Sequence, residues 1–258
     1  MALIEESKNV NHNLNDSTNH KVPETIIKLS GVSKIYNSGS NTVTALKNVD
    51  LEVKKGELLV ILGPSGSGKT TLLNIIGGLD LPTKGSLIVD KIQLKNRKQL
   101  ERIRKEKIGF IFQFFNLLPN LTAQENVEYV LELLKRKDRK QQSIHYLDQV
   151  GLKNRANHFP SQLSGGEQQR VAIARALAKT PLVILADEPT GELDYETGIK
   201  VLEILTKFVT ELQTAIIIVT HNQEIAKIAD RIIKLGNGQI RSISDTRSKK
   251  ILPRDLKW

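Results

Sequence analysis

The sequence predicts an α/β fold in which buried strands alternate with helices. Residues 58–62 form a continuous apolar run, which is typical of a strand buried on both faces. A glycine-rich loop and a helix with an apolar face follow this run. Two further apolar runs, residues 182–186 and 215–220, enclose an amphipathic stretch over residues 197–212. This alternation indicates a mainly parallel sheet that helices cover.

The loop after the first buried strand fits the phosphate-loop pattern G-x-x-x-x-G-K-[ST]. Its glycines let backbone N–H groups curl around a phosphate chain, and the helix that begins near Lys69 directs its positive end at the same anion. Lys69 can reach the β- and γ-phosphates, and the Thr70 hydroxyl can bind Mg²⁺. The predicted nucleoside triphosphate site consists of Gly63, Pro64, Ser65, Gly66, Ser67, Gly68, Lys69, Thr70 and Thr71.

The other strands are predicted from apolar patterns and turn residues. Residues 49–53 alternate apolar and polar side chains, as a half-exposed antiparallel strand does. Asn237-Gly238 is a hairpin signal between two short apolar segments. No element is assigned to the strongly basic residues 91–107 that precede the last strand before the helical section. The expected strands are residues 26–29, 49–53, 86–89, 108–113, 232–235 and 239–240.

A helical section is expected between residues 114 and 180. Thr122 and Glu125 form a capping-box pattern that opens one helix, and Ser164 and Glu167 form another. A further helix is expected over residues 141–150, and Gly151 closes it. The loop after Gln113, at the start of this section, is rich in Phe and Leu at positions 114, 115, 117 and 118. This composition suits the docking of a short helix from a membrane partner, and the alternative is that about half of these side chains belong to the core of the helical section.

The composition restricts the classes of protein to consider. The 258 residues, 39% of them hydrophobic, suffice for a sizeable core. No apolar run approaches the ~18 residues that span a bilayer, and the first residues lack secretory features. The absence of cysteine excludes disulfides and Cys-based zinc sites, which suits the cytoplasm. The net charge of +10 indicates nucleic acid, an anionic membrane surface, or simply solvated lysines.

Candidate catalytic residues follow the predicted strands. Asp187 and Glu188 come directly after residues 182–186, at the sheet edge where open α/β sheets bind ligands. Asp187 can hold Mg²⁺ through water, and Glu188 can orient and deprotonate an attacking water. Gln113 ends another strand and could contact Mg²⁺ or the water, or lie on the surface. His221 follows residues 215–220 and is either structural or part of the same edge.

A second anion site is predicted where a helix begins at Ser164-Gly165-Gly166, with exposed N–H groups and a hydroxyl. Ser164 lies 95 residues after Lys69, within the helical section. Such a site is hard to fold onto the phosphate loop of the same chain. We therefore expect this helix start to bind the nucleotide that another copy of the chain holds.

Residues 163–177, LSGGEQQRVAIARAL, resemble the signature motif of ABC ATPases. The phosphate loop, Gln113, Asp187-Glu188 and His221 follow that family's order, so the resemblance covers residues 26–240. Residues 112–119 and 186–190 further resemble the lipoprotein-release, macrolide-export and peptide-export branch. The resemblance implies a P-loop NTPase core with an antiparallel β subdomain and a helical signature subdomain.

The resemblance also implies ATP and Mg²⁺ as ligands, held between two domains that pair head to tail. It implies that Tyr36 stacks on adenine and that Glu188 is the general base. His221 would contact the γ-phosphate and position the water. The implied Mg²⁺ ligands are Thr70, Gln113 and Asp187. Ser164, Gly165 and Gly166 would contact the partner's γ-phosphate, and Glu167 belongs to the same partner-site signature. Glu192 departs from the branch, which more often has Asn there, and adds negative charge near the expected dimer seam.

These observations predict three parts of the chain: a disordered extension (residues 1–24), a nucleotide-binding domain (residues 25–241, with its helical subdomain at about 114–180) and a basic tail (residues 242–258). The expected protein is an ATPase subunit of an ABC transporter. It would be a homodimer in the cytoplasm, held at the inner face of the cell membrane through a separate permease. No direct nucleic acid contact is expected.

Two alternatives stay open at this stage. A regulatory ABC ATPase that gates a membrane partner without transport would carry the same nucleotide machinery. A nucleic-acid-associated ABC ATPase is suggested by the charge of +10. The separation of 95 positions between Lys69 and Ser164 leaves no room for the long coiled coil of the chromosome-maintenance types.

Overall fold

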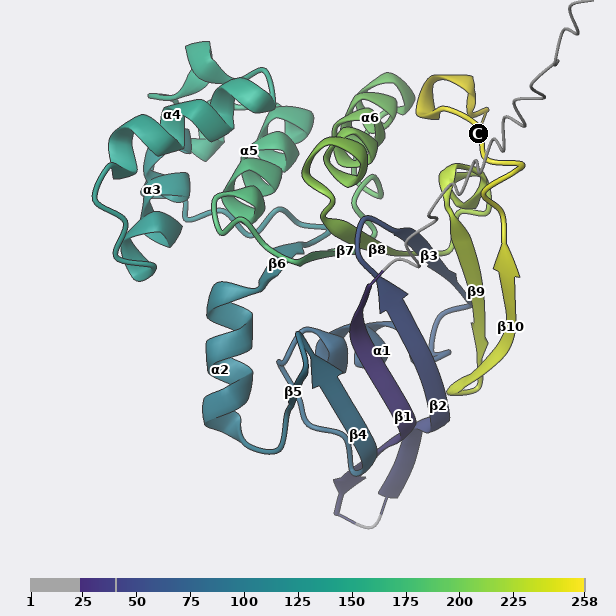
Figure 1. Ribbon diagram of the computed structural model, residues 1–258. Helices are drawn as coiled ribbons and strands as arrows, with labels where there is room; N and C mark the ends of the chain where they lie inside the picture. Colours follow the sequence, from purple (N-terminus) through teal and green to yellow (C-terminus); the bar gives the residue numbers. More distant parts are fainter. Residues whose placement is uncertain (1–23, 40, 258) are drawn as a thin grey trace, which may run out of the picture.

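Two β-sheets and a group of helices make up the part of the chain that the computed structural model describes, residues 24–39 and 41–257 (Figure 1). All of the predicted N-terminal extension except Glu24 lies outside the described residues. In Figure 1, helices α3 to α6 lie above the larger sheet, and the smaller sheet lies below it, with α1 between the two.

The larger sheet has six strands, and all neighbours in it are parallel except β9 and β10. The three apolar runs predicted from the sequence, β3, β7 and β8, lie in this sheet and are almost entirely buried. The prediction of an α/β fold with a mainly parallel sheet is therefore confirmed. In spatial order the strands are β10 (Gln239–Asp245), β9 (Arg231–Gly236), β3 (Leu58–Leu62), β8 (Ala215–Thr220), β7 (Val183–Asp187) and β6 (Ile108–Ile111).

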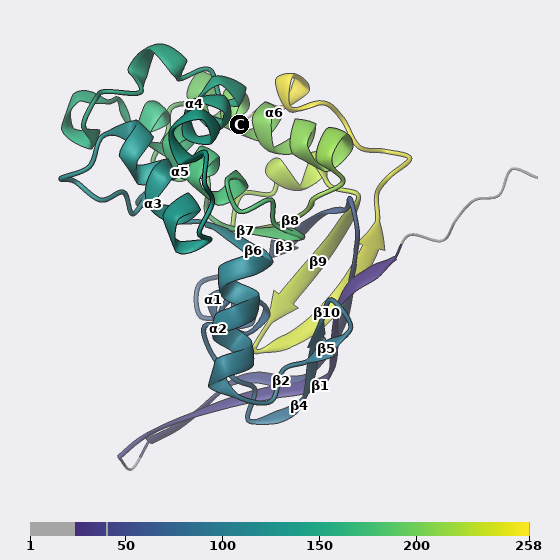
Figure 2. The same ribbon diagram turned by 60° about the vertical axis from the view of Figure 1, so that its left-hand side comes forward.

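The smaller sheet is antiparallel, and two of its strands are much longer than predicted. Residues 26–29 and 49–53 are only four of the 14 residues of β1 and five of the 14 residues of β2. The ladder continues past irregularities in its register, and the exposed outer half of β2 shows no alternation of burial that a pattern could reveal. Figure 2 shows these outer ends projecting from the molecule. The order is β2 (Asn41–Lys54), β1 (Thr25–Ser38), β4 (Lys84–Val89) and β5 (Ile92–Gln93).

Two helices, α3 and α5, begin at their predicted capping residues, α4 and α6 begin two residues before their predicted starts, and one helix was not predicted. The capping boxes at Thr122 and Ser164 are both formed. The helix over residues 97–106 was not predicted, because only Leu100 and Ile103 of its ten residues are buried and its remaining side chains read as a charged loop. The helices are α1 (Lys69–Ile76), α2 (Arg97–Glu106), α3 (Ala123–Leu133), α4 (Arg139–Gln149), α5 (Gly165–Leu177) and α6 (Tyr195–Leu212).

The hydrophobic core has two parts, one on each face of the six-stranded sheet. Side chains of β3 alternate between them: Leu58, Val60 and Leu62 pack with helices α3 to α6, whereas Leu59 and Ile61 pack with α1 and the smaller sheet. This two-sided burial explains why β3 is a continuous apolar run. It also fixes the loop after β3 between two rigid layers.

Residues 246–257, which belong to the predicted basic tail, pack against α6 and the segment after β8. Leu256 is buried in the core, and its carbonyl accepts a hydrogen bond from the Tyr195 hydroxyl. The Lys250 ammonium lies 2.6 Å from a carboxylate oxygen of buried Asp230, whose other oxygen accepts from the Leu58 amide. Among the helices of the described residues, none is long and apolar enough to cross a membrane.

Candidate nucleotide site

The phosphate loop connects β3 to α1 at the carboxyl edge of the large sheet. Gly68 has φ +100°, a left-handed conformation that suits glycine, and a side chain there would collide with the Ala45 carbonyl. Gly63 is equally confined, because a Cβ would lie 2.4 Å from the Leu235 carbonyl oxygen. The Lys69 ammonium donates hydrogen bonds to the carbonyls of Gly63 and Pro64, at 2.6 and 3.0 Å. Carbonyl groups at the start of the loop therefore bind the ammonium group of Lys69 at its end.

Asp187 ends β7 beside the first turn of α1. Its Oδ2 lies 3.5 Å from the Thr70 hydroxyl oxygen, which is the predicted pair of protein oxygens at a cation site. Burial raises the pKa of Asp187, and the neighbouring charge of Glu188 raises it further. Thr70 and Lys69 act in the opposite direction. A cation bound here would favour the ionised carboxylate.

Glu188 is held by the end of the adjacent strand, β8. The Thr220 hydroxyl donates to Glu188 Oε2 at 2.8 Å, and the backbone amide of His221 donates to Oε1 at 3.0 Å. The His221 Nδ1 lies 2.7 Å from the same Oε1. Glu188 has a left-handed φ of +46°, an unusual backbone for a non-glycine residue, and such outliers gather at functional sites. The structure therefore brings the two predicted catalytic groups, Glu188 and His221, into direct contact.

Gln113 lies just after β6 and is fixed by a partner that the sequence did not suggest. Its Nε2 donates to Glu192 Oε1 at 2.8 Å. Gly191 approaches the same amide, because a Cβ at Gly191 would lie 3.4 Å from Gln113 Nε2. Glu192 thus contacts a predicted Mg²⁺ ligand within its own chain.

An open cavity of about 650 Å³ joins these groups. The predicted residues that line it are Ser65, Gly66, Gly68, Lys69, Thr70, Thr71, Gln113, Asp187 and Glu188. Gly63, Pro64, Ser67 and His221 do not line the cavity; Ser67 is buried beneath the loop. The sequence missed six lining residues, which the tertiary fold brings to the site: the Lys47 amide of β2 donates to the Gly238 carbonyl of the β9–β10 turn, and the Gly238 amide donates to the Ser67 carbonyl of the phosphate loop. These residues are Val43, Thr44, Ala45, Lys47, Asn237 and Gly238.

Tyr36 lies on β1, outside the lining of this cavity. Its hydroxyl donates to Asp80 Oδ2 at 3.0 Å, and the Lys34 ammonium lies 4.9 Å from the centre of its ring. Burial raises the pKa of the Tyr36 hydroxyl, and the hydrogen bond to Asp80 adds to the rise. With 40% of its surface exposed, the ring is accessible to a ligand.

The signature residues form the first turn of α5, away from the phosphate loop. The Ser164 hydroxyl accepts from the Glu167 amide, and a Glu167 carboxylate oxygen accepts from the Ser164 amide, at 3.2 and 2.9 Å. Arg155 donates to the other Glu167 oxygen. Gly166 packs on Thr197, which leaves no room for a Cβ. None of the signature residues lines the cavity that contains Lys69.

The donor set suits Mg²⁺. Thr70, Gln113 and Asp187 offer hydroxyl, amide and carboxylate oxygens, the hard ligands that Mg²⁺ prefers. Among the described residues no group of three His, Cys, Asp or Glu could hold a metal. This arrangement fits a Mg²⁺ that is bound jointly by a few protein oxygens and the phosphates of a nucleotide.

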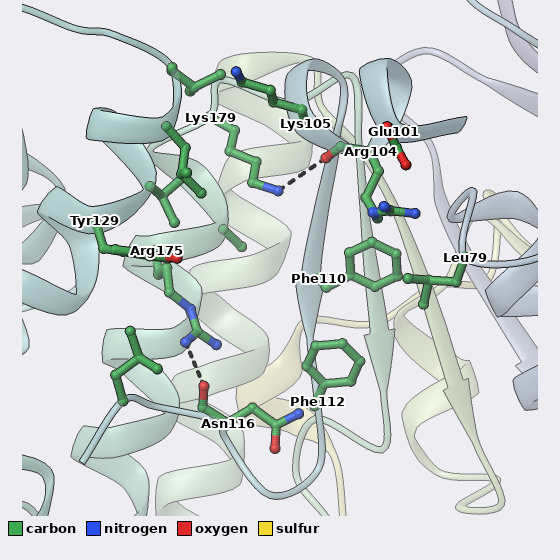
Figure 3. Close-up of a pocket in the computed structure, with 15 residues that line it drawn as sticks. Leu79, Glu101, Arg104, Lys105, Phe110, Phe112, Asn116, Tyr129, Arg175 and Lys179 are labelled. Carbon is green, nitrogen blue, oxygen red and sulfur yellow. Dashed lines mark hydrogen bonds between the residues drawn. The ribbon is translucent and has the colours of Figure 1, made fainter. Parts of the chain in front are cut away.

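A second cavity, of about 530 Å³, lies between α2, α3 and the end of α5 (Figure 3). Leu79, Phe110, Phe112 and Leu118 give it apolar walls. Lys179 follows the C-terminal end of α5 and donates to the carbonyls of Arg104 and Ile108, at 3.1 and 3.2 Å. Burial lowers the pKa of Lys179 to about 8, and the charges of Arg175 and Arg104 lower it in the same direction.

The Phe- and Leu-rich loop predicted to dock a partner contributes only part of this cavity. Leu118 lines it, Phe114 is 70% exposed outside its lining, and Leu117 packs against the core. Phe115 lies 3.6 Å from the position that a Cβ on Gly165 would take. The loop therefore lies between the second cavity and the signature turn.

Comparison with known proteins identifies relatives along most of the chain. The family model described as "ABC transporter" matches residues 46–191. The ABC transporter ATP-binding protein MJ0796 of Methanocaldococcus jannaschii is 49% identical over 83% of this chain and 95% of its own length. The lipoprotein-releasing system ATP-binding protein LolD of Legionella pneumophila is 48% identical over 80% of this chain and 93% of its own.

Solved structures agree with these sequence matches. A dimeric structure of MJ0796 in a post-hydrolysis state, bound to ADP and Pi, superposes with a TM-score of 0.80 and 46% identity. The superposition covers 86% of this chain and 99% of that one. A second dimeric structure of the same cassette gives a TM-score of 0.80 at 47% identity.

Proposed function

Because the chain belongs to the ABC transporter family and is an ATP-binding, ATP-hydrolysing subunit of a transporter, we propose that two copies pair head to tail around two ATP molecules and power a separate membrane permease. One observation carries this proposal. The signature turn at Ser164 does not line the cavity that contains Lys69, so one copy holds only half of the site. A dimeric relative bound to ADP and Pi supports the same arrangement.

In this dimer, the phosphate loop of one copy and the first turn of α5 of the other would enclose the triphosphate. Lys69 and the N–H groups of both helix ends would stabilise the charge that develops on the γ-phosphate. Thr70, Gln113 and Asp187 would hold Mg²⁺, which neutralises phosphate charge when bound. The exposed face of Tyr36 is available to stack on adenine.

Glu188 would accept the proton of the attacking water. Its two carboxylate oxygens are fixed by Thr220 and His221, so the base is oriented before substrate arrives. His221 would contact the γ-phosphate and position the attacking water beside Glu188. The hydrogen bond between Gln113 and Glu192 connects this proposed Mg²⁺ ligand to the loop that follows Glu188.

The permease would dock in the second cavity. Its apolar walls, with Leu79, Leu118 and Tyr129 all exposed by more than a third, suit a short amphipathic helix. Phe112 in this cavity and Gln113 at the nucleotide site are consecutive residues, so docking and hydrolysis would share one segment. We propose accordingly that the protein is peripheral at the inner face of the cell membrane.

The first test is the sedimentation of Glu188→Gln with and without Mg-ATP. Removing the base should leave ATP bound and unhydrolysed, so the closed dimer accumulates only with nucleotide. Adding Ser164→Arg should abolish the dimer while each copy still binds ATP, because the arginine blocks the signature turn. Adding Ser242→Arg, on exposed β10, is the matched control and should leave dimerisation unchanged.

Two outcomes would contradict the proposal. A Glu188→Gln chain that hydrolyses ATP as fast as the parent would exclude Glu188 as the base. A chain that binds Mg-ATP but stays monomeric at every concentration tested would exclude a shared site formed by two copies alone.

A further inference from the structure

Two basic segments border the second cavity. The first is α2 with the following Lys107 (residues 97–107), and the second is the turn between α3 and α4 (residues 135–140). We call them the basic flanks. Together they hold eleven Lys or Arg against three Asp or Glu, a net charge of +8 in 17 residues, where the whole chain carries +10. Nearly all of the chain's excess charge is therefore concentrated beside one cavity.

The first basic flank lines this cavity, and the second adjoins it. Glu101, Arg104 and Lys105 of α2 contribute to its lining, as do Tyr129 and Leu133 of α3. Figure 3 shows Tyr129 across the cavity from Glu101 and Arg104. The second flank begins directly after Leu134, which also lines the cavity. The two segments thus frame the site proposed to dock the permease.

Most of these cations are exposed and unbalanced. Arg102, Lys107 and Arg139 have carboxylate partners within 4 Å. Seven exposed cations form no ion pair with any residue that the structure describes: Arg97, Lys98, Lys105, Lys135, Arg136, Lys137 and Lys140. Like charges held this close repel one another, and an anionic surface would relieve that repulsion.

We propose that the basic flanks contact anionic phospholipid headgroups beside the permease, so that the subunit touches the membrane directly as well as through its partner. The choice of lipid rests on the proposed docking of the permease in the cavity, because that docking turns both flanks toward the bilayer. Exposed Leu79, Tyr129 and Leu133 between the flanks suit the headgroup region better than a nucleic acid backbone. Each Lys or Arg near an anionic membrane surface strengthens binding by about fivefold.

The test is cosedimentation of the full chain with lipid vesicles. Vesicles of phosphatidylcholine should not bind it, whereas vesicles with a large fraction of phosphatidylglycerol should bind it with an affinity that falls steeply as salt is added. The flank variant Lys98→Gln, Lys135→Gln, Lys137→Gln and Lys140→Gln should lose binding by at least tenfold. The matched control Lys55→Gln, Lys200→Gln, Lys234→Gln and Lys249→Gln removes the same charge elsewhere and should lose less than threefold.

Three outcomes would overturn the inference. Equal binding to neutral and anionic vesicles, or no binding to either, would exclude headgroup recognition. Equal losses in the flank and control variants would assign the effect to total charge. Binding of duplex DNA more tightly than the anionic vesicles, lost in the flank variant, would assign the flanks to nucleic acid. Basal ATPase activity and ATP-dependent dimerisation of the flank variant, measured without vesicles, separate these failures from a failure of the proposed function.

Discussion

At the scale of single residues, the site depends on side chains that adjacent strands bring together. Thr220 and His221 at the end of β8 hold Glu188 at the end of β7. The sequence predicted Glu188 and His221 as candidates because both follow buried strands. It did not predict Thr220, because the pairing of Asp187 with Val219 sets this contact, and pairing is a property of the folded sheet.

Glu192 provides a residue-scale prediction. Its carboxylate accepts from Gln113, which lines the cavity of the phosphate loop, so it adds negative charge beside the predicted triphosphate site. Glu192→Gln keeps the shape and should tighten ATP binding by about twofold at low salt, with less gain at high salt. The measurement is a nucleotide titration at two ionic strengths.

Glu196→Gln serves as the control for this prediction. Glu196 is exposed on the first turn of α6 and has no contact with Gln113. Equal effects of the two substitutions would mean that only net charge matters, and the contact with Gln113 would then have no role in binding.

At the scale of elements, the success of prediction followed the strength of local signals. β3 and β8 were predicted residue for residue, because a strand buried on both faces is an unbroken apolar run. The first residues of the two helices with capping boxes were also predicted correctly. Helix α2 was missed because Leu100 and Ile103 alone give too weak a period. The outer half of β2 was missed because tertiary pairing, not side-chain pattern, maintains it.

The cap of α3 can be tested by mutation. Thr122→Ala removes the hydroxyl that accepts from the Glu125 amide, and such a loss costs about 1 kcal/mol of the free energy of unfolding. For a domain of this size the thermal midpoint should fall by about 2–4 °C. Thr122→Ser keeps the hydroxyl and should recover most of the loss. If Ala and Ser variants melt together, the capping box does not stabilise α3.

At the scale of the whole molecule, the C-terminal segment is part of the core and not a free tail. Leu256 is 1% exposed, so Leu256→Ala should lower the free energy of unfolding by about 2–5 kcal/mol. Leu252, four residues earlier, is 49% exposed, and Leu252→Ala is therefore the matched control with a small effect. Urea unfolding measures both. Two equally stable variants would show that the segment does not pack as described.

The arrangement of the two sheets explains which site residues could not be predicted from the sequence. The phosphate loop, Asp187 and Glu188 carry local signatures and were found. Thr44, Lys47 and Asn237 have none, and they reach the cavity only because β2 and the β9–β10 hairpin close over the loop. The sequence likewise showed the strongly basic residues 91–107, but only the folded structure places them beside the cavity that α3 also lines.

The closure of the phosphate loop by distant segments has a consequence for synthesis of the protein. The Gly238 amide donates to the Ser67 carbonyl, and Asp230 binds the Leu58 amide across 172 residues of chain. At about 5–20 residues per second, the ribosome takes about 10–30 s to deliver these partners after the loop itself. A nascent chain therefore carries an incomplete nucleotide site for most of its translation, and cellular ATP can stabilise the domain only when its last strands have emerged.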